Sequence, residues 1–154
     1  MRSHLFSLIL ILTLGASLQA YDTERADFFH NYYQKLTQQT LSDSKLFLGA
    51  EEAVAMLYSD NRPLLLDIRT EAEAAVVGLT YEDSMLIPLD KLFNKEQLDR
   101  LPTDRTIILV CYSGTRAAMA ATALQMSGIT NIRVLKGGVA ALAKATTPKS
   151  VPLR

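Results

Sequence analysis

The chain has 154 residues, of which 49% are hydrophobic and 21% are charged. This composition is typical of a globular protein and excludes a disordered or fibrous one. The chain carries 16 basic and 16 acidic residues, so no excess charge favours binding to a nucleic acid or to an anionic membrane surface. The length allows one buried core and is too short for two well-packed domains.

The first twenty residues have the pattern of a secretory signal peptide. Arg2 supplies a basic start, residues 5–14 are almost entirely apolar, and a stretch rich in small residues ends at Ala20. We therefore interpret residues 1–20 as a signal peptide that is cleaved after Ala20. The alternative is an uncleaved membrane anchor, although the apolar run is short for a spanning helix. After removal of the signal, no stable insertion into a membrane is expected.

Residues 21–45 are predicted to form a helical extension ahead of the main domain. Aromatic and leucine side chains recur there at helical spacing, from Phe28 to Leu36. Apolar stripes of this kind usually pack on a core, so we expect the aromatic face to pack against the domain. Binding of this helix to a partner protein is the alternative.

From residue 46 to residue 145, short strands alternate with helices. This alternation predicts an α/β domain with a mostly parallel sheet, in which ligands bind beyond the carboxyl ends of the strands. Residues 146–154 contain two prolines and are predicted to be irregular. The predicted strands are residues 46–48, 64–68, 85–87, 106–110 and 132–135, and the predicted helices are residues 51–58, 71–77, 89–101 (one or two turns), 117–126 and 139–144.

Cys111 follows the most apolar predicted strand and is the only cysteine in the chain, so no intramolecular disulfide can form. The segment Cys111-Tyr112-Ser113-Gly114-Thr115-Arg116 leads from that strand into a helix. Main-chain amides at such a turn, the helix N-terminus and a full positive charge on Arg116 all favour a thiolate, the nucleophilic form of cysteine. Gly114 permits a tight path that a side chain would block. The alternative is an inert core cysteine.

This arrangement suits a sulfur atom that attacks a donor and then carries a second sulfur. The same amides would receive a persulfide anion or an oxyanion such as thiosulfate. A cysteine protease is poorly supported, because His30 is the only histidine outside the predicted signal peptide and lies outside the α/β region. Neither a metal nor a cofactor is expected.

Several motifs occur in the order found in single-domain rhodaneses. Cys111, Gly114 and Arg116 match the Cys-x-x-Gly-x-Arg active-site loop of that family. The chain resembles the family over residues 46–144, and the ordered set of motifs is a stronger signal than any single one. The other matching segments are Leu65-Leu66-Asp67-Ile68-Arg69 followed by Glu73, Ile87-Pro88-Leu89, and residues 131–142 with Val134-Leu135-Lys136-Gly137-Gly138.

The resemblance implies an α/β fold with a rhodanese-like five-stranded parallel sheet flanked by helices. It also implies transfer of sulfane sulfur from thiosulfate or polysulfide, through a persulfide on Cys111, to a thiol or cyanide acceptor, including a thiol on another protein. The resemblance thus implies that Cys111 is the catalytic residue. The loop has Cys-x4-Arg spacing, one residue shorter than the Cys-x5-Arg loop of related dual-specificity phosphatases, which favours sulfur over phosphate esters. The expected substrate-binding residues are Tyr112, Ser113, Gly114, Thr115 and Arg116.

Three positions depart from the family pattern. Leu79 follows Gly78 where the family has histidine, and Leu142 replaces a tryptophan; both changes are expected to affect the scaffold. Tyr112 stands where relatives often have arginine, which should weaken the attraction for anions. The departure after Gly78 and the aromatic N-terminal helix leave a second function open, a non-catalytic rhodanese-like module that binds a partner or carries sulfur in the cell envelope.

Two further groups are expected to be structural. Asp67, Arg69 and Glu73 are predicted to form an ion-paired brace at a strand end, because charged groups must be paired if they are buried. Gly137-Gly138 is predicted to let the backbone turn closely beneath the active loop.

The signal peptide and the fold together predict that the protein is located in the bacterial periplasm, with secretion from a eukaryotic cell as the alternative.

Overall fold

The computed structural model describes residues 20–38 and 44–147, which belong to two units that divide between Thr37 and Gln38. The first unit contains α1 (Thr23–Tyr33), whose N-terminus is capped by the Asp22 carboxylate. The prediction of a helix within residues 21–45 is confirmed, whereas packing of its aromatic face against the domain stays a prediction. The expected signal peptide, apart from Ala20, and residues 148–154 of the expected tail lie outside the described residues.

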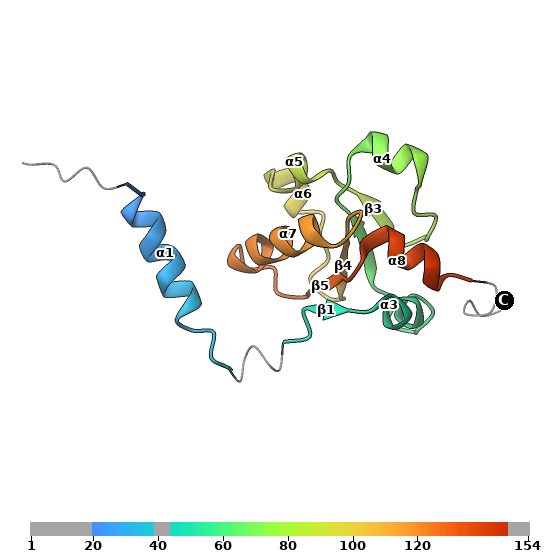
Figure 1. Cartoon of the computed structure of the whole chain (residues 1–154), viewed down its shortest axis with the longest axis horizontal. Coiled ribbons are helices and arrows are strands. Elements are labelled where there is room, and N and C mark those ends of the chain that lie inside the picture. Colours follow the sequence, from blue (N-terminus) through green and yellow to red (C-terminus); the bar gives the residue numbers. More distant parts are fainter. Residues whose placement is uncertain (1–19, 39–43, 148–154) are drawn as a thin grey trace, which may run out of the picture. The chain divides into compact units, whose positions relative to one another are not determined.

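The second unit is built on a five-stranded parallel sheet with the strand order β1-β5-β4-β2-β3 (Figure 1). The central strand β4 lies between β5 and β2, and all of its side chains are buried. A strand covered on both faces needs apolar residues at every position, which explains the unbroken Ile-Ile-Leu-Val run. The predicted parallel sheet is confirmed. The strands are β1 (Phe47–Leu48), β2 (Leu64–Asp67), β3 (Ser84–Leu86), β4 (Ile107–Val110) and β5 (Ile132–Leu135).

Helices cover both faces of this sheet (Figure 1). On one face, α3 and α8 bury residues against Leu65, Ile108 and Leu135. On the other face, α5 and α7 pack over the alternate strand residues, such as Leu66 and Leu109. None of the described helices is both long and apolar enough to cross a membrane. The helices of this unit that Figure 1 labels are α3 (Ala50–Leu57), α4 (Glu71–Val76), α5 (Leu89–Leu92), α6 (Lys95–Leu98), α7 (Thr115–Met126) and α8 (Gly138–Ala145).

Strand β2 leads into a buried ion pair. Asp67 is 3% exposed and Arg69 is 2% exposed. Arg69 Nε donates to Asp67 Oδ1 at 2.9 Å and Nη2 donates to Oδ2 at 2.6 Å, while the same Nη2 donates to the Val77 carbonyl at 2.7 Å. Hydrogen bonding to Asp67 raises the pKa of Arg69. The predicted brace is confirmed for Asp67 and Arg69, and it ties the end of β2 to the residue after α4.

The turn after β5 is pressed against the chain that leaves β4. Val139 N donates to the Cys111 carbonyl at 2.9 Å. Gly138 has φ 55°, and a Cβ added there would lie only 2.2 Å from the Cys111 carbonyl oxygen. Only glycine fits both this backbone conformation and this approach. The predicted role of the Gly137-Gly138 pair is therefore confirmed.

Arg69→Met should destabilise the protein strongly. The substitution leaves the Asp67 carboxylate buried without its cationic partner, so we expect the free energy of unfolding to fall by about 3–5 kcal/mol in urea titrations. Arg100→Met, at an exposed arginine, is the matched control and should change it by less than about 1 kcal/mol. A loss of the same small size in both variants would contradict a structural role for the pair.

Gly138→Ala should displace the chain at Cys111. The added methyl group collides with a carbonyl oxygen, so we expect a loss of about 3 kcal/mol or more in the free energy of unfolding. Gly128→Ala is a matched control, because Gly128 also has a positive φ, 92°, but a Cβ there meets nothing within 4 Å. This control isolates the backbone cost of about 1 kcal/mol. Equal losses in the two variants would exclude the close approach at Gly138.

Candidate active site

Cys111 lies at the carboxyl end of β4, at the point where the chain turns into α7. Its side chain is only 1% exposed and contacts the core on the α7 face of the sheet. The backbone N–H of Gly114 nevertheless donates to Cys111 Sγ at 3.1 Å. The sulfur is thus buried, but a main-chain donor of the loop points at it. An amide hydrogen bond of this kind stabilises a charged sulfur more than a neutral one.

Gly114 gives the loop its shape. It has φ 103° and is the N-cap residue of α7, which therefore begins at Thr115, two residues earlier than predicted. A Cβ on Gly114 would lie 3.2 Å from the Leu135 carbonyl oxygen and 3.4 Å from Gly137 N, so the loop rests directly on the turn after β5. No side chain caps α7. The first backbone N–H groups of α7 therefore have no side-chain acceptor. They lie at the positive end of the helix dipole, which is close to the sulfur of Cys111.

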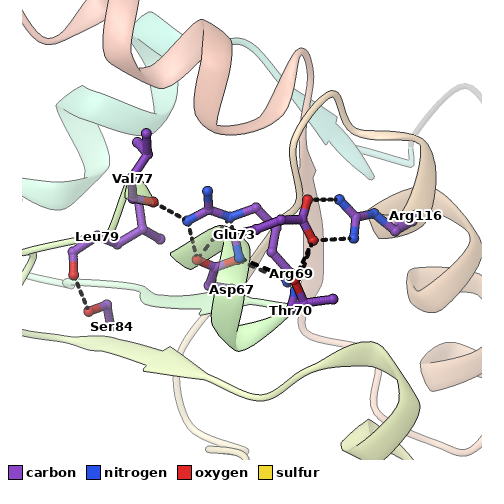
Figure 2. A network of polar contacts seen from close by, with 8 residues as sticks. All are labelled: Asp67, Arg69, Thr70, Glu73, Val77, Leu79, Ser84 and Arg116. Carbon is purple, nitrogen blue, oxygen red and sulfur yellow. Dashed lines mark hydrogen bonds and ion pairs between the residues drawn. The ribbon is translucent and has the colours of Figure 1, made fainter. Parts of the chain in front are cut away.

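Arg116, in the first turn of α7, pairs with Glu73 of α4. Arg116 Nη1 donates to Glu73 Oε2 at 2.9 Å, and Nη2 donates to Oε1 at 2.6 Å. Figure 2 shows the two planar groups facing each other. The pairing with Glu73 raises the pKa of Arg116, and the Cys111 side chain adds to the increase. The sequence predicted a full positive charge beside Cys111; in the structure a carboxylate compensates much of that charge.

Glu73 is held in place from its own helix as well. Its Oε2 accepts hydrogen bonds from the Thr70 backbone N–H and hydroxyl, both at 3.0 Å, and Thr70 Oγ1 accepts from Glu73 N at 3.2 Å. These contacts form a capping box at the start of α4. The hydrogen bonds from Arg116, followed by the bond from the Thr70 backbone, lower the pKa of Glu73 to about 2. The carboxylate is therefore charged at any physiological pH.

The sequence reasoning missed this role of Glu73, which was expected to brace the strand end with Asp67 and Arg69. A detectable signal was present: Thr70-x-x-Glu73 matches a capping box, which places Glu73 at a helix start near the carboxyl edge of the sheet.

The predicted loop residues differ in exposure. Tyr112 is 61% exposed and Ser113 and Thr115 are also exposed, whereas Gly114 and Arg116 are partly buried. Their contact with substrate stays a prediction.

A pocket of about 440 Å³ lies beside α3 and α8, on the face of the sheet opposite the α7 face that Cys111 contacts. Leu79 and Leu142, the two scaffold departures noted in the sequence, both line it, and none of the six loop residues does. These departures therefore alter a cavity outside the Cys111–Arg116 loop. Among the described residues, no group of three or more His, Cys, Asp or Glu side chains could hold a metal ion.

Comparison with known proteins identifies the family. The model of the rhodanese-like domain matches residues 49–145. The probable adenylyltransferase/sulfurtransferase MoeZ of Mycobacterium tuberculosis is 35% identical over 95 residues, which cover 62% of this chain but only 24% of that protein. A sulfurtransferase of Allochromatium vinosum is 32% identical over 89 residues, covering 58% of this chain and 79% of the relative. The chain thus spans about a quarter of the length of the mycobacterial relative.

Solved structures show the same fold at low sequence identity. A rhodanese-related protein of Thermoplasma volcanium aligns with a TM-score of 0.55 and 24% identity, covering 66% of this chain and 93% of that one. The single-domain sulfurtransferase RDL2 of Saccharomyces cerevisiae aligns with a TM-score of 0.55 and 16% identity, covering 71% of this chain and 97% of that one. The family match, the order of the strands and the position of the Cys111–Arg116 loop agree: the chain belongs to the rhodanese-like domain family, whose members include sulfurtransferases.

Proposed function

We propose that the protein is a sulfurtransferase that moves sulfane sulfur from thiosulfate or polysulfide, through a persulfide on Cys111, to a thiol or cyanide acceptor. The observation that carries this proposal is the hydrogen bond from Gly114 N to Cys111 Sγ, within a loop of Cys-x4-Arg spacing. Relatives named as sulfurtransferases, at 32% and 35% identity, support the same activity.

With thiosulfate as donor, the first step forms one bond and breaks another. The Cys111 thiolate attacks the outer sulfur of the donor, a new S–S bond forms, and the bond between that sulfur and the sulfonate group breaks. Sulfite leaves with the electron pair. An acceptor thiolate or cyanide then attacks the outer persulfide sulfur and releases the Cys111 thiolate. The two steps balance without an added oxidant or reductant.

The loop fits the intermediate of this reaction. A persulfide extends the side chain by roughly 2 Å beyond the buried sulfur of Cys111. The terminal sulfur carries the negative charge, and the main-chain donors of the loop, with the uncapped start of α7, would stabilise it there. Burial of the inner sulfur limits the access of bulk thiols to it, so that the outer sulfur is the one an acceptor meets.

A second candidate function is a non-catalytic module that binds a partner or carries sulfur. The 1% exposure of Cys111 favours this alternative, because a buried sulfur reacts slowly with dissolved donors. Turnover separates the two functions: an enzyme releases thiocyanate repeatedly from thiosulfate and cyanide, whereas a binding module does not.

The periplasm is the proposed location of the reaction, because residues 1–20 have the pattern of a signal peptide.

Intact-mass measurement tests the intermediate directly. After incubation with thiosulfate, and separately with polysulfide, the reduced protein should gain the mass of one sulfur atom, because the thiolate attacks the donor sulfur. Cyanide should remove the added sulfur. Since Cys111 is the only cysteine, Cys111→Ser is a clean control that should gain nothing. A wild-type protein that gains no sulfur from either donor would overturn the proposed function.

A further inference from the structure

The guanidinium of Arg116 is already occupied in the free protein. Its two terminal nitrogens bind the two oxygens of Glu73 in the paired geometry that an incoming oxyanion would otherwise use. An anionic donor at the loop therefore meets a compensated cation. It has to share Arg116 with the carboxylate or displace that carboxylate.

Displacement of Glu73 is unfavourable because both Arg116 of α7 and Thr70, the N-cap residue of α4, hold its carboxylate. The Thr70 backbone N–H and hydroxyl both bind Glu73 Oε2, so moving the carboxylate also breaks the cap of α4. The carboxylate is charged wherever thiol chemistry is measured, because its pKa is about 2. A permanent negative charge is thus fixed next to the guanidinium that interacts with Cys111.

Arg116 is the cation that pairs with this carboxylate, and the ion pair beside it contributes no further free positive charge. Asp67 and Arg69 form a closed pair of their own. Tyr112, at the loop position where an arginine would add positive charge, is neutral and exposed. A donor with two negative charges would gain little attraction from such a loop, and it would feel more of the repulsion from Glu73 than a donor with one charge.

We infer that Glu73 is a specificity-determining residue: its carboxylate lowers the reactivity of Cys111 toward doubly charged anions such as thiosulfate and favours singly charged donors such as the hydropersulfide anion. The inference deepens the proposed function and rests on it for the identity of the substrates. The charge effect at Cys111 can be measured without any sulfur transfer.

Alkylation of Cys111 by a charged and a neutral reagent tests the inference. The probe is the ratio of the rate with iodoacetate to the rate with iodoacetamide, in which the accessibility of the sulfur largely cancels. Glu73→Gln retains an acceptor for Arg116 and a residue suited to the capping box. We expect this variant to raise the ratio roughly fivefold. Glu71→Gln, which removes an exposed carboxylate of α4 paired with Lys91, is the matched control and should leave the ratio unchanged.

Arg116→Gln provides the reverse test, because it leaves the Glu73 carboxylate without compensation and should lower the ratio by a similar factor. If Glu73→Gln alone does not fold, the double variant Glu73→Gln/Arg116→Gln decides the question, because its ratio should exceed that of Arg116→Gln only if the Glu73 carboxylate repels the charged reagent. An unchanged or lower ratio in folded Glu73→Gln, an equal increase in Glu71→Gln, or an unchanged ratio in Arg116→Gln would overturn the inference.

A second arm compares persulfide formation from thiosulfate and from hydropersulfide. Relative to hydropersulfide, thiosulfate should react several-fold faster with Glu73→Gln than with the wild type. Failure of both donors on the wild-type protein would refute the proposed function, while the alkylation ratio would still decide the charge effect of Glu73. An alkylation ratio that rises as expected without a change in donor preference would refute the assignment of donor specificity to Glu73.

Discussion

Two glycines with positive φ, Gly114 and Gly138, confine the backbone around Cys111, and the site depends on that constraint. Gly114 turns the chain with φ 103°, which brings its N–H to 3.1 Å from Cys111 Sγ. The carbonyl of Cys111 accepts from Val139 N, and Gly138 leaves no room for a side chain at that contact. Glycines on two neighbouring turns thus hold the sulfur against a main-chain donor, the N–H of Gly114. The pairing of β4 with β5 brings these two turns together, so the position of this donor depends on the centre of the sheet.

The charged side chains around this backbone form ion pairs. Asp67 neutralises Arg69 at the end of β2, and Glu73 neutralises much of the charge of Arg116 at the loop (Figure 2). The site therefore relies on oriented amides more than on an unpaired cation, and amide dipoles attract an anion over a shorter range than a full charge does. Such a loop suits an anion that is bound covalently to Cys111 better than it suits the capture of distant anions.

The sequence predicted the fold because its signals are local. The buried strands are unbroken apolar runs, and the Cys-x4-Arg loop with Gly137-Gly138 indicates the family from the sequence alone. The pairing of Arg116 with Glu73 was not predicted, since the partners are 43 residues apart and meet only when β2 and β4 pair. The depth of Cys111 was also not predicted, because burial at a strand end depends on the helices packed around it. The start of α7 at Thr115 depends on the left-handed conformation of Gly114, which the composition of the helix does not indicate.

Amide-proton chemical shifts of the loop would test most directly whether main-chain donors hold the sulfur of Cys111. Spectra of the reduced protein are compared with spectra of the same protein after polysulfide has added one sulfur. The account predicts that the amide resonances of Gly114 and of its neighbours in the Cys111–Arg116 loop move together, while those of α1 do not. A protein that carries the added sulfur but shows no change in these loop amides would contradict it.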